Sequence, residues 1–329
     1  MSLAESPRVS VIIPTYKRAH MVARAINSVL AQTFADFELL VIDDCSEDNT
    51  EEVVKGIEDA RIRYLPRSVN QGASAARNTG IHAARGEYFA FLDSDDQWIP
   101  TKLETQLKVF QDTDWPNLGI VMCGYISQDE EGTEEALPSA RGGNLYEAFL
   151  LHQIGCVTAS VILTRRSAWS QPLLFDEDLA CGEDWDYLTR ASQRAQVDYV
   201  SQPLVLLDRC KGDHLTDLKG ALMESWRRIR EKNYSYLRSR PRLLMLYHQS
   251  TLRRHHLYRH RDRIRRDALQ ALLDFPYHPI PYLWVLGALF GSLTLRLALR
   301  VFSLEDKPAE AIETLYRVAS RFLCRRPHL

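Results

Sequence analysis

Three aspartates stand close together directly after an apolar run, in the stretch "EYFAFLDSDDQWIP" of residues 87–100. Carboxylates packed this closely repel one another unless a positive charge lies among them. Asp93, Asp95 and Asp96 therefore form either a solvated turn that caps the next helix or a site for a cation. Carboxylate and water oxygens are the preferred ligands of Mg²⁺ and Mn²⁺, which in turn bind phosphate groups.

The segments around these aspartates alternate between strand and helix. Apolar, β-branched runs predict four buried strands, at residues 9–13, 38–42, 62–65 and 88–92. Apolar residues at helical spacing after Met21, helix-start residues at 46–50 and small residues at 73–84 predict the helices between them. Continuously apolar strands that alternate with helices indicate a parallel sheet covered by helices on both faces.

Polar residues follow each predicted strand at its carboxyl end. These clusters are residues 14–18, 43–44, 70–72 and 93–96. Ligands of open α/β sheets bind outside this edge of the sheet. We therefore expect the four clusters to converge on one pocket, which favours the cation interpretation of the aspartates.

The stretch "GASAARNTGI" opens one of the predicted helices. Gly72 lets the backbone approach a ligand, the helix N-terminus attracts phosphate, and Arg77 has the length to reach a diphosphate. The alanines fit tight packing of the helix on the sheet equally well. The stretch is neither a G-x-G-x-x-G fingerprint nor a Walker A loop, so it does not indicate a dinucleotide or P-loop site.

A second acidic segment, "FDEDLACGEDWDYLTRAS", spans residues 175–192 and leads into another predicted helix. Glu183, Asp184 and Asp186 lie at the start of that helix. A carboxylate here can act as a general base if it lies within reach of a bound hydroxyl. From the residues alone, acidic capping of the helix N-terminus is the favoured explanation of the segment.

The whole-chain composition is that of an ordinary folded protein, with 41 Lys+Arg against 43 Asp+Glu in 329 residues. This balance gives no global bias towards nucleic acid. The 6 cysteines include no C-x-x-C pair, which suits neither a zinc site nor a disulfide framework and indicates a reducing compartment. The start, "MSLAESPR", lacks a signal-peptide pattern, so we expect a cytoplasmic protein.

Taken together, the motifs resemble those of the family 2 glycosyltransferases. The stretches "VSVIIPTYKR", "QTFADFELLVIDDCSEDNT", "NQGASAARNTGI", "GEYFAFLDSDDQWIP" and "LLFDEDLACGEDWDYLTRAS" stand in the family's order and spacing between Val9 and Thr216. The resemblance implies the α/β fold called GT-A, a mostly parallel sheet flanked by helices. Residues 1–217 would form the nucleotide-sugar-binding and catalytic domain, and residues 218–329 a helical C-terminal appendage.

The resemblance also implies roles for individual residues. Asp184 matches the catalytic base, and Asp95 and Asp96 would lie nearest a Mg²⁺ or Mn²⁺ ion. Asp44 would bind the base, typically uracil. The nucleotide-sugar site would comprise Pro14, Thr15, Tyr16, Arg18, Asp44, Gly72, Arg77, Asp93 and Asp95, with Lys211 and His214. Many relatives have a histidine where Lys211 stands, in the loop that closes over the diphosphate, and His214 is the alternative for that role.

The implied reaction is inverting, metal-dependent transfer of a sugar from a nucleoside-diphosphate sugar, typically a UDP-sugar, to a hydroxyl of a glycan or lipid-linked acceptor. Two alternatives stay open. A nucleotidyltransferase would favour a glycine- and lysine-rich first loop, whereas "PTYKRAH" contains no glycine. A non-catalytic transferase-like scaffold would not need the intact acidic residues.

The C-terminal region combines an arginine-rich run, residues 226–266, with an apolar stretch at 280–302. Residues 280–295 carry no charge but are fewer than the ~20 apolar residues of a membrane-spanning helix. This stretch predicts either a buried helix, as at the interface of a homo-oligomer, or a helix lying peripherally on the cytoplasmic face of a membrane. The arginine-rich run has no aromatic interleaving or binding motif for nucleic acid, so no nucleic-acid partner is expected.

Overall fold

The structure is a computed structural model of the 329-residue chain. It describes residues 6–128, 132–138, 142–155, 157–208, 219–257, 267, 269–271 and 273–274. Lys211, His214 and the apolar stretch 280–302 lie outside the described residues. The chain divides into two compact units, residues 1–233 and 234–329.

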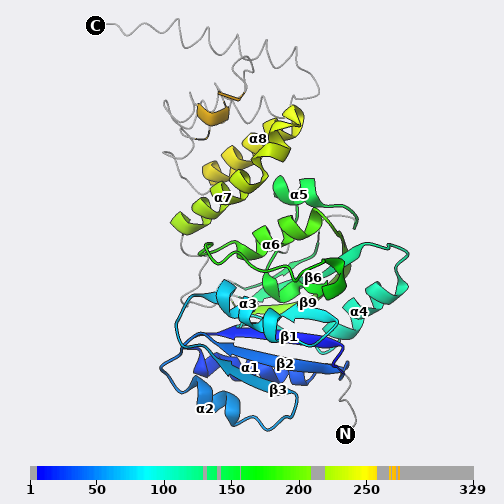
Figure 1. The fold of residues 1–329 in the computed structure, drawn as a ribbon, viewed down its shortest axis with the longest axis vertical. Coiled ribbons are helices and arrows are strands. Elements are labelled where there is room, and N and C mark those ends of the chain that lie inside the picture. Colours follow the sequence, from blue (N-terminus) through cyan, green and yellow to red (C-terminus); the bar gives the residue numbers. More distant parts are fainter. Residues whose placement is uncertain are drawn as a thin grey trace, which may run out of the picture. The chain divides into compact units, whose positions relative to one another are not determined.

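The first unit is built on a mixed sheet, nine-stranded in the described residues, with the order β3-β2-β1-β4-β8-β6-β9-β5 and β7 paired with β6. The strands are β1 (Val9–Thr15), β2 (Phe37–Asp43), β3 (Ile62–Pro66), β4 (Tyr88–Phe91), β5 (Gln97–Trp98), β6 (Leu118–Gln128), β7 (Thr133–Ala136), β8 (Leu163–Arg165) and β9 (Gln196–Asp208). Figure 1 shows β1, β2 and β3 lying side by side.

All four strands predicted from apolar runs are present, and they form the β3-β2-β1-β4 part of the sheet in parallel pairs. Burial explains their apolar character, since every residue of β1, β2 and β4 is buried. Beyond β4 the sheet is mixed, because β8 runs antiparallel to both β4 and β6, while β9 returns parallel to β6.

Helices flank this sheet, and further helices follow it along the chain. They are α1 (Ala19–Leu30), α2 (Thr50–Lys55), α3 (Ala73–Ala83), α4 (Lys102–Asp112), α5 (Tyr146–Leu150), α6 (Glu183–Ser192), α7 (Lys219–Arg238) and α8 (Pro241–Leu257), with short 3₁₀ turns η1 (Ala159–Val161) and η2 (Arg166–Ala168). Helix α3 packs on β1 and β2, whereas α1 packs on α2 and β1. Because parallel crossovers are right-handed, the reversal between β3 and β4 puts α3 on the face opposite α1 and α2.

Close packing of α3 on the sheet depends on one glycine. A Cβ atom at Gly80 would lie 2.5 Å from Cγ2 of Ile12 in β1, so no larger residue fits without movement. The small residues of this helix, which the sequence left open between packing and ligand binding, therefore serve packing along at least this face. The approach brings the N-terminal turn of α3 to the carboxyl edge of β1 and β2.

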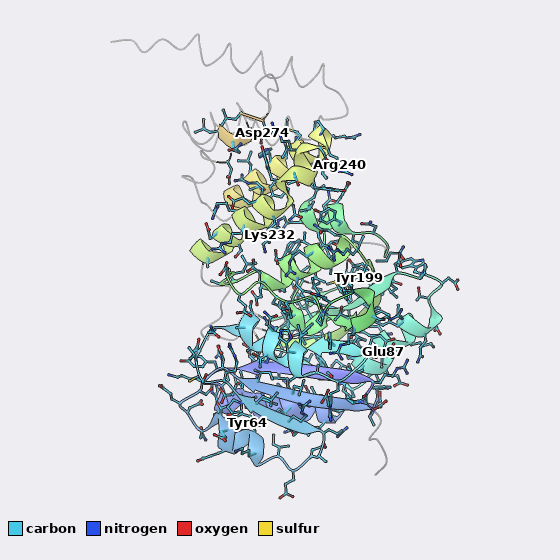
Figure 2. All side chains as sticks on the ribbon, viewed as in Figure 1. Tyr64, Glu87, Tyr199, Lys232, Arg240 and Asp274 are labelled. Carbon is cyan, nitrogen blue, oxygen red and sulfur yellow. The ribbon has the colours of Figure 1, made fainter. Side chains whose placement is uncertain are left out.

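Helix α7 crosses the division between the two units, because residues up to 233 belong to the first unit and those from 234 to the second. Within the second unit, the buried His248 lies 2.7 Å from one carboxylate oxygen of Asp274, and the hydroxyl of Tyr234 donates to the other at 2.9 Å (Asp274 is labelled in Figure 2). Among the described helices of both units, none has the length and apolar character to cross a membrane.

Candidate active site

The carboxyl ends of β1, β2 and β3 lie in register at one edge of the sheet. Thr15 at the end of β1 pairs with Asp43 at the end of β2, and Asp43 pairs with Pro66 at the end of β3. The next residue, Asp44, donates its backbone N–H to the carbonyl of Thr15 at 2.9 Å. The structure therefore brings the first three predicted polar clusters together at this edge.

Asp44 is 2% exposed, and its carboxylate is bound by the chain itself. It forms an ion pair with Arg67 and accepts the backbone N–H groups of Gln71, at 3.1 Å, and Gly72, at 2.6 Å. Gly72 has a φ of +89°, a conformation that favours glycine, and it directly precedes α3. Asp44 thus fixes the loop that leads into the N-terminus of α3 against the end of β2.

Two hydroxyl groups beside Asp44 are buried without a hydrogen-bond partner, as far as the described residues extend. They are Oγ1 of Thr15 and Oγ of Ser74, in side chains 3% and 4% exposed. Leaving such a group unpaired costs free energy, and in native structures it calls for an explanation such as a functional role or contact with a water or ion. The neighbouring Tyr16 is 41% exposed, while Pro14 is buried and Arg18 half-buried at the start of α1.

Arg77 of α3 is 3% exposed and lies between two carboxylates. Its guanidinium is 2.5 Å from Oδ1 of Asp93 and 2.8 Å from Oε1 of Glu183, and it lies over the ring of Phe175 at 5.2 Å. Burial disfavours the charged guanidinium and lowers its pKa. The negative charges of Asp93 and Glu183 outweigh this effect and raise the pKa of Arg77 above its ordinary value. Arg77 therefore joins the acidic turn after β4 to the acidic pair at the start of α6.

A neighbouring residue of α3, Asn78, holds the segment before that acidic pair. Its side-chain amide donates to the carbonyl of Phe175 at 3.0 Å and accepts the backbone N–H of Phe175 at 2.8 Å. The same amide donates to the carboxylate of Glu177 at 2.8 Å. Helix α3 thus anchors both the segment at 175–177 and the pair Glu183–Asp184.

The acidic turn is held from inside by a serine that the sequence analysis did not identify. Ser160 of η1 is fully buried, donates its hydroxyl to Oδ2 of Asp96 at 2.6 Å and accepts the backbone N–H of Asp93 at 3.1 Å. Burial and the nearby charges of Asp93 and Asp95 raise the pKa of Asp96 well above its ordinary value, although Ser160 opposes this. The carboxylates are thus close enough to affect one another.

We expect Ser160→Ala to destabilise the protein by about 1–3 kcal/mol, because the buried carboxyl of Asp96 loses its hydroxyl donor. Urea denaturation followed by circular dichroism measures this change. Ser192→Ala is a matched control, since Ser192 is also fully buried but donates its hydroxyl to the carbonyl of Thr189 in its own helix. An equal decrease in the free energy of unfolding in the two variants would show that the hydrogen bond to Asp96 stabilises the protein no more than an ordinary buried hydrogen bond.

Asp95 is half-buried, and its backbone carbonyl accepts Nη2 of Arg24 at 3.3 Å. The same guanidinium forms an ion pair with Asp208 at 2.8 Å, at the end of β9. Across the described part of the chain, no group of three or more His, Cys, Asp or Glu side chains is arranged to hold a metal ion. The assignment of Asp95 and Asp96 as metal ligands remains a prediction.

Asp184 lies in the first turn of α6, after Gly182, whose φ of +70° turns the chain into the helix. Oδ1 of Asp184 accepts the backbone N–H of Trp185 at 2.6 Å. Burial, together with the charge of Glu183, raises the pKa of Asp184 to about 7, against the lowering effects of Trp185 and Arg77. A carboxyl with a pKa near neutrality can accept a proton from a substrate hydroxyl at physiological pH.

Comparisons with known proteins agree with this architecture. A family model described as "Glycosyl transferase family 2" matches residues 10–171. The chain is 30% identical over 191 residues to the putative colanic acid biosynthesis glycosyl transferase WcaA of Escherichia coli, covering 57% of this chain and 67% of that protein. The chain belongs to glycosyl transferase family 2.

Two further relatives match less of their own length. The E. coli protein named UDP-Glc:alpha-D-GlcNAc-diphosphoundecaprenol beta-1,3-glucosyltransferase WfgD is 35% identical over 170 residues, which are 52% of this family 2 chain and 66% of WfgD. An uncharacterized glycosyltransferase of Rickettsia bellii is 35% identical over 212 residues, which are 64% of this chain but 30% of that protein.

Among solved structures, S. aureus TarS 1-349 in complex with UDP-GlcNAc is similar with a TM-score of 0.57 and 19% identity, covering 74% of this family 2 chain and 66% of that one. At this identity the likeness shows the fold alone. It confirms the predicted GT-A class, a sheet flanked by helices.

Proposed function

We propose that this protein is an inverting, metal-dependent glycosyltransferase that moves a sugar from a UDP-sugar to a hydroxyl of a glycan or lipid-linked acceptor. The observation that carries the proposal is the Arg77 bridge between Asp93 in the acidic turn and Glu183, the neighbour of Asp184. It puts an acid with a pKa of about 7 and a cluster of interacting carboxylates into one site, as metal-assisted sugar transfer needs.

In this proposal Asp184 acts as the general base. It removes the proton from the acceptor hydroxyl while the acceptor oxygen forms a bond to the anomeric carbon of the sugar. The bond from that carbon to the diphosphate oxygen breaks at the same time, and the nucleoside diphosphate leaves with the electron pair. Because attack comes from the face opposite the leaving group, the anomeric configuration inverts.

The acidic turn fits a divalent cation because burial and the charges of Asp93 and Asp95 raise the pKa of Asp96, and a cation among these carboxylates would remove the repulsion. Asp95 and Asp96 would hold Mg²⁺ or Mn²⁺. A bound ion would neutralise the charge of the departing diphosphate, which then needs no protonation. Lys211, with His214 as the alternative, is the proposed cation of the loop over the diphosphate.

The remaining site residues line the proposed nucleotide pocket. Asp44 and the unpaired hydroxyl of Thr15 face the base and ribose, with Tyr16 and Arg18 beside them and the N-terminus of α3 near the phosphates. The names of WfgD and of the TarS complex support a UDP-sugar donor, and the name of WfgD supports a lipid diphosphate acceptor. An acceptor of that class would place the reaction at the cytoplasmic face of a membrane.

A panel of nucleotide sugars with and without Mn²⁺ tests the proposal by thermal shift, because a ligand that binds only the native state raises its Tm. We expect UDP-sugars with Mn²⁺ to give the largest shift. Thr15→Val should leave the Tm of the free protein unchanged or raised, since it removes an unpaired buried hydroxyl, and should reduce the shift caused by UDP.

Ile57→Val, a similar change in a half-buried residue just after α2, serves as the control and should keep the full shift. A full shift in Thr15→Val would reject the role of its hydroxyl. If no nucleotide sugar shifted the wild-type protein, the proposed function would be wrong. Release of pyrophosphate instead of UDP would favour a nucleotidyltransferase.

A further inference from the structure

The first half of α7 bonds directly to the segment that carries Asp184. Within the first compact unit, Ser225 donates its hydroxyl to the carbonyl of Cys181 at 2.5 Å, and Arg228 forms an ion pair with Asp178 at 3.2 Å. One turn further on, Lys232 reaches the same segment. These three α7 residues are spaced i, i+3 and i+7, so they lie on one face of the helix.

Lys232 makes the strongest of these contacts because it binds both ends of the segment. Its ammonium is 2.6 Å from Oδ1 of Asp186 in α6, and it also forms an ion pair with Asp176 (Lys232 is labelled in Figure 2). The carboxylate of Asp186 is 1% exposed, and Arg190 binds its other oxygen at 2.7 Å. A buried carboxylate that loses one of its paired cations is strongly destabilised in its buried position, so the position of the Asp186 side chain depends on Lys232.

A stack of aromatic rings also connects α7 to the start of α6. The rings of Trp226 and His152 pack edge to face, with centroids 5.7 Å apart and an interplanar angle of 70°. His152 stacks on Trp185 at 4.5 Å and 23°, and the backbone N–H of Trp185 binds the carboxylate of Asp184. The position of the Asp184 carboxylate therefore depends on α6, and α6 is held by α7 through both contacts.

We propose that Lys232 is a positioning residue for the catalytic base, acting by clamping Asp176 to Asp186 across the segment that carries Asp184. The inference rests on the proposed function, since it takes Asp184 as the base. It extends the active site from the start of α6 to α7, a helix of the C-terminal region. Lys232 itself need not contact either substrate.

The test compares Lys232→Met with Lys232→Arg in the full chain, using UDP release with UDP-GlcNAc as the probe donor. We expect kcat of Lys232→Met to fall by about 10-fold to 100-fold, because a displacement of a reacting group by about 1 Å can lower the rate by this much. The affinity for UDP should stay within about twofold, since Asp44 and Thr15 are untouched. Lys232→Arg should recover most of the rate, because it restores the charge.

Arg227→Met is the matched control. Arg227 is the residue after Trp226 in α7, and it pairs with Glu224 and Glu231 of the same helix. Because both partners belong to α7 and not to the segment at 176–186, its loss should leave kcat unchanged. Hydrogen exchange gives a readout that does not depend on activity. In Lys232→Met the backbone N–H groups of residues 183–186 should exchange faster than in the wild-type protein, while those of α3 should not.

Three outcomes would overturn the inference: an unchanged kcat in Lys232→Met, no recovery in Lys232→Arg, or a parallel loss of UDP affinity and rate. If the wild-type protein transfers no sugar from UDP-GlcNAc or another nucleotide sugar, the proposed function fails by itself. Exchange at residues 183–186 then still decides whether Lys232 holds the segment, and unchanged exchange would reject it.

Discussion

Asp184→Asn should lower kcat by about 10²-fold to 10⁴-fold, the usual contribution of a general base, while UDP binding is retained. Asparagine keeps the size of the side chain but cannot accept the proton of the acceptor hydroxyl. UDP release measures turnover, and a thermal shift with UDP measures binding. Unchanged turnover would reject the base assignment. Asp36→Asn is the control, because Asp36 is an exposed acid just before β2.

The same residue sets the expected pH dependence. Asp184 must be deprotonated to act, and its pKa is raised to about 7, so kcat/KM should rise with pH up to about 7 and then level off. Because the folded state holds this proton more tightly than an unfolded chain does, the contribution of Asp184 to stability decreases as pH rises from its ordinary pKa of 3.8 to about 7. If kcat/KM of the wild-type protein did not change with pH near neutrality, the assignment of Asp184 as the titrating base would be contradicted.

Arg77→Met should destabilise the protein by about 3–5 kcal/mol, because it leaves buried acids without their cation. Arg77 is 3% exposed, and its two partners, Asp93 and Glu183, would then face each other without compensation. Urea denaturation measures the free energy of unfolding. Lys55→Met removes an exposed pair with Glu51 in α2 and should cost less than about 1 kcal/mol.

The double variant Arg77→Met with Glu183→Gln shows where this cost comes from. If unpaired carboxylates cause it, removing one of them should restore part of the stability lost in Arg77→Met. No recovery would mean that the packing of Arg77 over Phe175 contributes more than its charge. An Arg77→Met variant as stable as the wild type would contradict the bridge itself.

The parallel half of the sheet could be predicted because its strands are continuous apolar runs of adequate length. The mixed half could be predicted only in part. The apolar run at residues 161–164 indicates the strand β8, whereas β5 has two residues, too short for a periodic pattern. The antiparallel entry of β8 between β4 and β6 also depends on contacts between residues far apart in the sequence. No local signal specifies such a pairing.

For the candidate site, the sequence identified the acidic clusters at the strand ends but not the groups that hold them. Ser160 and Arg67 are single residues outside any motif, so nothing local distinguishes them from ordinary polar residues. Arg77 was expected to reach a diphosphate, and the structure has it between Asp93 and Glu183, so contact with a diphosphate remains a prediction. The domain boundary after residue 217, implied by the family resemblance, remains a prediction; the compact units of the structure divide after residue 233.

The helix that crosses this division has a practical consequence for anyone who shortens the chain. A fragment that stops at Thr216 would keep every motif shared with the family, yet it would lack the face of α7 that grips residues 176–186. Soluble expression of such a fragment would say little about its ability to catalyse the reaction. A minimal version should run to Arg238, where α7 ends.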